Sequence, residues 1–214
     1  MSRRIVRLAV PALVLLPAFP SAIGGWAITI VDDLPDYAVA GELLALIFSV
    51  RQHGVQPLEK LKPRIEVLGR GERRTYTAVG IGSLGRYTTA FTLPRAGDWI
   101  ITIHSGFGES RTTLMPLTAI TRGSPAPPAL SEAERGRRLF AAKGCLTCHV
   151  ELRAGPDLFS KRYTKEYVSQ VLADPERVFA GRQGTLRMPN LNLNAREIGA
   201  LAAYLGANKG VAAR

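Results

Sequence analysis

The chain has 214 residues, and 46% of them are apolar, which excludes a disordered chain and allows one large or two small domains. No segment recurs at a fixed period, so repeat architectures are excluded as well. The formal net charge is +11, which points to an acidic partner or to nucleic acid.

Residues 1–25 have the pattern of a secretory signal peptide. A basic start at residues 3–7 precedes an apolar run at 8–19 and then a group of small residues. We predict cleavage between Ala22 and Ala27. The alternative is an uncleaved membrane anchor, but the run is shorter than the ~20 residues that span a membrane. Pro11 and Pro17 also interrupt it, and Pro20 follows it directly.

Residues 26–120 consist of short β-type segments bounded by Gly, Pro or Asp. Within residues 43–50, for example, Leu44 and Phe48 fall on one face of a strand and Ile47 on the other. Six or seven such segments predict an immunoglobulin-like β-sandwich. The expected strands are 26–31, 43–50, 64–68, 73–79, 87–93, 99–103 and 111–120.

A second pattern lies in the later strands of this domain. It consists of Gly85-Arg86-Tyr87, Phe91, Pro94, Gly97 and Trp99-Ile100-Ile101-Thr102-Ile103. It resembles the immunoglobulin-like accessory domains of the YtkA-like and FixH-like kind. We expect Tyr87, Phe91 and Trp99 to be core residues. The domain is then a scaffold or docking module.

Some relatives of such sandwiches handle copper, so His53, His104 and Met115 are candidate ligands. A cupredoxin centre needs a thiolate with two imidazoles, and residues 26–120 contain no cysteine. That type of centre is therefore excluded. A weak His/Met copper site stays open, and its alternative is that these are ordinary surface or packing residues.

Residues 121–130 contain three prolines and predict an extended, semi-rigid linker. At ~3.1 Å per residue in polyproline II, it would hold two domains about 30 Å apart, or let them pivot.

The motif with the most chemical content is Cys145-Leu146-Thr147-Cys148-His149. In Cys-x-x-Cys-His the two thiols bind one haem covalently and the imidazole ligates its iron. A thioredoxin-like redox pair or half of a zinc site are the alternatives. The βαβ setting of the first is missing, and no later Cys or His completes the second. We therefore predict one covalently attached haem c.

Met188 is the candidate for the second iron ligand. It lies 39 residues after His149, between two helical patterns, in a polar segment where packing gives little reason for a thioether. Core packing is the alternative role. A His/Met pair raises the reduction potential and fills both axial positions. This describes an electron carrier rather than an enzyme.

Residues 131–214 predict an all-α domain. Ser131 with Glu134, and Asn194 with Glu197, have the spacing of capping boxes at the start of two helices. A third helix is expected at residues 164–173, ended by Asp174-Pro175.

The arrangement of these residues resembles the class I cytochrome c family over some 80 residues. It is carried by Gly136, Phe140, Cys145, Cys148, His149, Gly155-Pro156, Met188-Pro189 and Tyr204. The resemblance implies thioethers at both cysteines and iron bound by His149 and Met188. It also implies that the Pro156 carbonyl accepts a hydrogen bond from the His149 ring and that the terminal helices cross near Gly136. Tyr163, Arg182 and Arg187 are candidates for holding the haem propionates, with plain surface residues as the alternative.

The positive charge is concentrated in the second domain. Residues 131–214 carry 14 Lys or Arg against 8 Asp or Glu, net +6, whereas residues 26–130 carry 11 against 9, net +2. Such a surface favours a redox partner with an acidic docking surface, and a merely solvated surface is the alternative. An exported haem domain without a binding motif argues against nucleic acid.

Together these patterns predict a periplasmic or otherwise extracytoplasmic monohaem cytochrome c, with the sandwich docking it onto a respiratory or photosynthetic complex. Two alternatives stay open. One is a haem enzyme or sensor with a displaceable Met188. The other is a copper-handling protein with the haem as electron donor.

Overall fold

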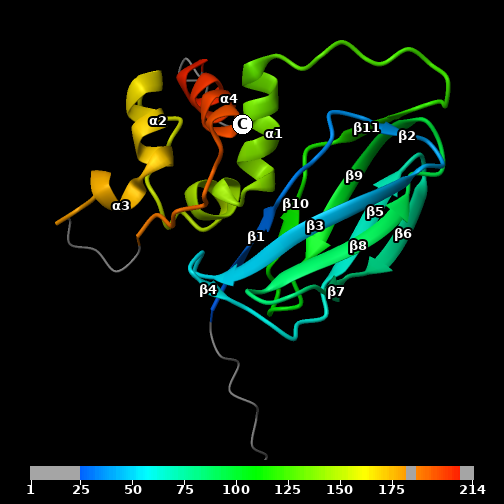
Figure 1. Cartoon of the computed structure of the whole chain (residues 1–214), viewed down its shortest axis with the longest axis horizontal. Helices are drawn as coiled ribbons and strands as arrows, with labels where there is room; N and C mark the ends of the chain where they lie inside the picture. Colours follow the sequence, from blue (N-terminus) through cyan, green and yellow to red (C-terminus); the bar gives the residue numbers. More distant parts are fainter. Residues whose placement is uncertain (1–24, 182–186, 208–214) are drawn as a thin grey trace, which may run out of the picture.

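The structure is a computed structural model that describes residues 25–181 and 187–207. A β-sandwich and a group of helices lie side by side, joined by an extended segment (Figure 1). The predicted order, an all-β domain followed by an all-α domain, is confirmed.

The sandwich consists of two sheets. One has the strand order β1-β3-β8-β7 with β4 paired to β3, and the other has the order β2-β11-β9-β5-β6 with β10 paired to β9. Neighbouring strands are antiparallel except β2 and β11. The bounds are β1 Ala27–Val31, β2 Ala38–Val39, β3 Leu43–Gln52, β4 Gln56–Pro57, β5 Arg64–Gly69, β6 Glu72–Thr77, β7 Val79–Gly80, β8 Arg86–Thr92, β9 Gly97–His104, β10 Arg111–Thr113 and β11 Leu117–Ile120.

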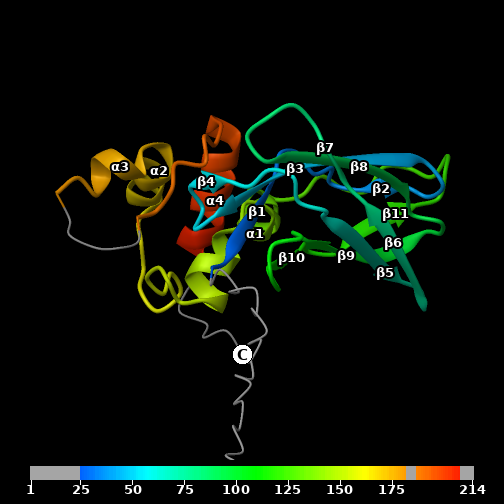
Figure 2. The same ribbon diagram turned by 90° about the horizontal axis from the view of Figure 1, so that it is seen from below.

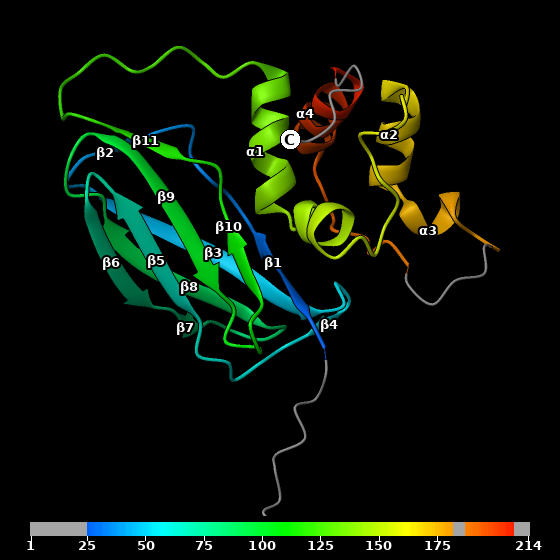
Figure 3. The ribbon, with the colours of Figure 1, turned by 180° about the vertical axis from the view of Figure 1, so that it is seen from behind.

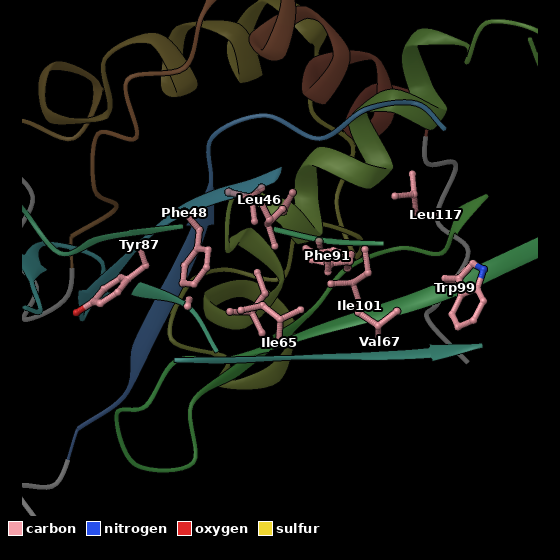
Figure 4. Close-up of a cluster of buried hydrophobic side chains, with 14 of the residues drawn as sticks. Leu46, Phe48, Ile65, Val67, Tyr87, Phe91, Trp99, Ile101 and Leu117 are labelled. Atoms are coloured by element: carbon pink, nitrogen blue, oxygen red, sulfur yellow. The ribbon is translucent and has the colours of Figure 1, made fainter. Parts of the chain in front are cut away.

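The sandwich core lies between the sheets, where alternate residues of the longer strands meet (Figure 4). Tyr87, Phe91 and Trp99 are at most 2% exposed, which confirms their expected core role. Two of them also satisfy their polar atoms there. The Tyr87 hydroxyl donates to the Leu58 carbonyl at 2.7 Å, and the Trp99 indole N–H donates to the Arg95 carbonyl at 2.9 Å. Buried polar groups without partners would destabilise the core.

Two expected strands are each divided in the structure. The segment expected at 73–79 changes sheets at Ala78, so β6 pairs with β5 and β7 pairs with β8. The segment expected at 111–120 is interrupted before β11, where Pro116 has no N–H to donate to a neighbouring strand. Across the second break the buried positions change phase, from Thr112 and Leu114 to Leu117 and Ala119.

The first and last helices of the second domain begin at the two predicted caps. The Ser131 side chain accepts from the Glu134 N–H at 3.2 Å, and Asn194 and Glu197 bond reciprocally. The short helix α3 was not predicted; the Asp174 side chain caps it, with proline at its first position. The bounds are α1 Glu132–Ala142, the π-helix η1 Thr147–Glu151, α2 Lys165–Ala173, α3 Pro175–Val178 and α4 Ala195–Ala207. Within residues 25–181 and 187–207, no helix has the length and apolarity needed to cross a bilayer.

Helices α1 and α4 cross at Gly136, as expected. A Cβ built on Gly136 would overlap the Ala200 carbonyl oxygen and lie 2.7 Å from Tyr204 Cβ. One turn further along α1, the rings of Phe140 and Tyr204 are 5.7 Å apart, and Phe159 completes an aromatic triad. The lack of a side chain at Gly136 therefore sets how closely the two helices approach.

The two domains are in direct contact through α1, which packs against β1 and β10 (Figure 3). The Arg135 guanidinium forms a bidentate pair with the Asp36 carboxylate at 2.8 and 2.9 Å. Arg138 donates to the Asp36 carbonyl at 2.9 Å, and Ala142 belongs to the sandwich core. The linker at 121–130 therefore does not hold the domains 30 Å apart.

Lys143 adds a buried ion pair to this interface. Its side chain is 7% exposed, and Nζ lies 2.7 Å from Glu197 Oε1 and donates to the Asp32 carbonyl at 2.9 Å. The contact joins the end of β1, the end of α1 and the start of α4. Because an unpaired buried ammonium is costly, this pair favours one relative placement of the domains.

Candidate haem-binding site

The residues that the sequence singles out come together at one cavity. Its volume is about 480 Å³, and it is lined by Cys145, Cys148, His149, Pro156 and Met188. Apolar side chains from α2, α4 and the segments between the helices form much of the remaining wall. The cavity has the size and largely apolar lining typical of a cofactor site.

The attachment motif lies where α1 ends and the chain turns. Gly144 has a φ of +75°, a left-handed conformation that glycine adopts without steric cost. The π-helix η1 follows and contains Cys148 and His149. The backbone N–H groups of Ala154 and Gly155 both donate to the Cys148 carbonyl, at 2.8 and 3.0 Å. These bonds fold the chain back so that Pro156 comes beside His149.

The His149 ring is held in a defined orientation. Its Nδ1 lies 2.9 Å from the Pro156 carbonyl oxygen, so Nδ1–H donates and Nε2 keeps its lone pair for a metal. Burial lowers the pKa of His149, which favours the neutral imidazole that binds metals. Gly155 lies against the ring, since a Cβ there would be 2.6 Å from His149 Cε1.

The two thiols have little nucleophilic character in this setting. Burial, with Cys148 nearby, raises the pKa of Cys145 to about 12. Burial, with Glu151 nearby, raises the pKa of Cys148 to about 11. A thioredoxin-like pair needs a thiolate of lowered pKa, so the environment argues against that alternative.

Met188 is half-buried and packs against the helical core, which includes Phe140, Leu172 and Leu201. It also lines the cavity with His149. Tyr163 and Arg187, two of the propionate candidates, line the same cavity. The third, Arg182, lies outside the described residues.

The donor set fits a haem. One imidazole, one thioether and two thiols meet in a single, largely apolar cavity, and imidazole with thioether is the ligand pair of c-type cytochromes. When bound, a haem supplies one-electron chemistry through its iron.

The copper candidates of the sandwich lie in different places. His53 is in the turn between β3 and β4 and lines the haem cavity, whereas His104 ends β9, opposite Arg64 and Arg111. In the described part of the chain, no group of three or more His, Cys, Asp or Glu residues is arranged to hold a metal ion.

The sandwich contributes three lining residues, a role that was not predicted from the sequence: Trp26, Ile28 and His53. The rings of Trp26 and His53 meet edge to face with centroids 5.1 Å apart. No local pattern indicates this role, because it depends on how the two domains pack.

The contact between Gly155 and the His149 ring leads to a prediction. In Gly155→Ala the added Cβ displaces the ring or the Pro156 carbonyl, and we expect the free energy of unfolding to fall by about 1–3 kcal/mol, the usual cost of overpacking. Chemical denaturation measures this. Gly80→Ala is the control, because a Cβ on Gly80 has no neighbour closer than 3.9 Å. Equal stability of the two variants would contradict the close packing of His149.

Comparison with sequence families gives a match to residues 131–205. The family is described as cytochrome c oxidase, cbb3-type, subunit III. No curated protein matches the chain.

Several solved structures are similar to part of this chain at low sequence identity. Escherichia coli α2-macroglobulin shares 16% identity over 44% of this chain, with a TM-score of 0.36, and the match spans 6% of its length. The PKD domain of the human receptor SorCS2 shares 12% identity over 58% of this chain and 99% of its own length, with a TM-score of 0.29. A CARDB domain from Pyrococcus furiosus shares 14% sequence identity over 45% of this chain and 89% of its own length, with a TM-score of 0.28. At these scores the similarities carry no argument about the sandwich.

The assignment of the first domain as a β-sandwich therefore rests on its strand topology. The helical domain is identified by its sequence and by the residues around its cavity. Residues 131–205 form a helical cytochrome c domain that matches the cbb3-type oxidase subunit III model, and a two-sheet β-sandwich precedes it in the chain.

Proposed function

We propose that the protein is an exported monohaem cytochrome c that transfers single electrons. Cys145 and Cys148 attach the haem, and His149 and Met188 ligate its iron. The observation that supports this most is the shared cavity, which brings both axial candidates and both thiols to one place. With both axial positions filled, the iron has no open coordination site for a substrate, so the proposed role is that of a carrier and not of an enzyme.

The surrounding residues would serve the haem in three ways. Pro156 fixes the tautomer and orientation of His149 through the 2.9 Å bond. The apolar wall excludes water and thereby raises the reduction potential. Tyr163 and Arg187 line the cavity, which supports a role for both in binding the propionates.

Covalent attachment is tested in protein produced by cells competent in cytochrome c maturation. Extraction with acidified acetone is expected to leave one haem per chain on the protein, measured as the pyridine haemochrome. The Cys145→Ser/Cys148→Ser variant is the control and should release all of its haem. Colourless wild-type protein after extraction would refute the proposal.

The proposed partner is a redox protein with an acidic docking surface in a respiratory or photosynthetic complex. The net charge of +6 in residues 131–214 supports the first part, and the matched family, an oxidase subunit, favours the respiratory complex. We propose an extracytoplasmic location because haem attachment and the leader-like residues 1–25 both point there. The proposed partner is tested by co-purification with a membrane complex, and added salt should reduce the amount that co-purifies.

A further inference from the structure

The sandwich forms part of the cavity that we assign to the haem. That cavity is lined by Trp26, which directly precedes β1, by Ile28 of β1 and by His53 of the β3–β4 turn, together with Cys145 and Met188. Figures 1 and 2 show β1 and β4 on the side of the sandwich that faces the helical domain.

Strand β1 presents one face to each domain. Ala27 and Val31 belong to the sandwich core, and side chains alternate along a strand. Ile28 and Ile30 therefore point away from that core, yet they are only 2% and 6% exposed. Helix α1 and strand β10 both contact β1, and Gly144, just after α1, lies against Ile28.

Ile28 lies between two glycines that adjoin the haem-binding segments. A Cβ on Gly144, the residue before Cys145, would be 3.1 Å from Ile28 Cβ and 3.2 Å from the Thr29 carbonyl oxygen. A Cβ on Gly54 would be 3.3 Å from Ile28 Cδ1 and 2.9 Å from Cγ of Pro189. Pro189 directly follows Met188. The sandwich thus touches the chain immediately before the first thiol and immediately after the methionine.

We propose that the β-sandwich is a structural wall of the haem site: β1 and the β3–β4 turn hold the Met188 segment against the attachment segment and keep water from the iron. Ile28 is the central positioning residue, acting directly on Gly144 and, by way of Gly54, on Pro189. This inference rests on the proposed function, because it assigns a role toward the haem.

The wall is fixed in place by polar contacts away from the cavity. The bidentate Arg135–Asp36 pair and the buried Lys143 contact with Glu197 and the Asp32 carbonyl hold β1 against α1. A domain attached in this way stays in place as part of the cavity wall, whereas a tethered one would move away from it by pivoting.

A matched pair of variants in the full chain tests the proposal. Ile28→Ala truncates an isoleucine that lines the cavity. Ile30→Ala makes the same truncation on the same face of the same strand, at a position that is not among the lining residues. Two quantities are measured. One is the affinity of the oxidised protein for imidazole, monitored as the loss of the methionine-to-iron absorption band, and the other is the reduction potential. Trp26→Ala, at a half-buried position, serves if Ile28→Ala does not fold.

We expect Ile28→Ala to bind imidazole roughly tenfold more tightly than wild type and to have a lower potential, because the apparent affinity follows the fraction of molecules in which Met188 has left the iron. Ile30→Ala should retain wild-type values of both.

Equal changes in the two variants would show a general packing effect and overturn the proposal. So would wild-type values for both Ile28→Ala and Trp26→Ala, in which case covalent haem in the same samples would leave the proposed function standing. Haem-free wild-type protein would refute both.

Discussion

Met188→Ala is expected to leave the haem attached and to remove its sulfur ligand. The cysteines and His149 lie in a separate segment, held by their own hydrogen bonds, so attachment should not depend on Met188. Loss of the thioether lowers the reduction potential, by something on the order of 0.1 V within the ~0.8 V range that axial ligands span. Redox titration and the methionine-to-iron absorption band measure the change, and carbon monoxide should bind the reduced variant.

Met115→Ala is the control for this prediction, since Met115 is half-buried as well but belongs to the sandwich. It should retain the band, the potential and the resistance to carbon monoxide. A band that persists in Met188→Ala would mean that another group is the ligand. Carbon monoxide binding to reduced wild-type protein would instead favour the enzyme or sensor alternative, in which Met188 leaves the iron.

The features that were predictable from the sequence are those encoded within a few residues. The cap formed by Ser131 depends on a residue three positions away, and the strands β1 and β9 follow from their own apolar patterns. The Cys145–His149 motif is equally local. Each of these signals acts before any distant part of the chain is in place.

The features that were missed depend on contacts between distant residues. Arg135 and Asp36 are 99 positions apart, and no composition or spacing connects them. The role of Ile28 in the cavity follows only once β1 packs against Gly144. The extended linker suggested separation because its prolines fix local stiffness, while the domain contact arises from surfaces elsewhere in the chain.

Gly136→Ala is expected to destabilise the helical domain strongly. A Cβ at this position overlaps the Ala200 carbonyl oxygen and lies 2.6 Å from its carbon, so α1 and α4 must move apart. Separation loosens the Phe140–Tyr204 contact as well. Overpacking of this kind costs more than the gain of about 1 kcal/mol in helix propensity, and we expect a net loss of about 2–4 kcal/mol in the free energy of unfolding, measured by chemical denaturation.

Gly199→Ala supplies the matched control, because it places the same methyl group on the partner helix where nothing lies within 4 Å. Only helix propensity changes there, so stability should rise by about 0.5–1 kcal/mol. The opposite signs of the two substitutions separate the packing of α1 on α4 from the intrinsic cost of glycine in a helix. If Gly136→Ala were instead stabilising, the two helices would have to cross at a greater distance, and the Lys143–Glu197 contact that joins their ends to the sandwich would need a different geometry.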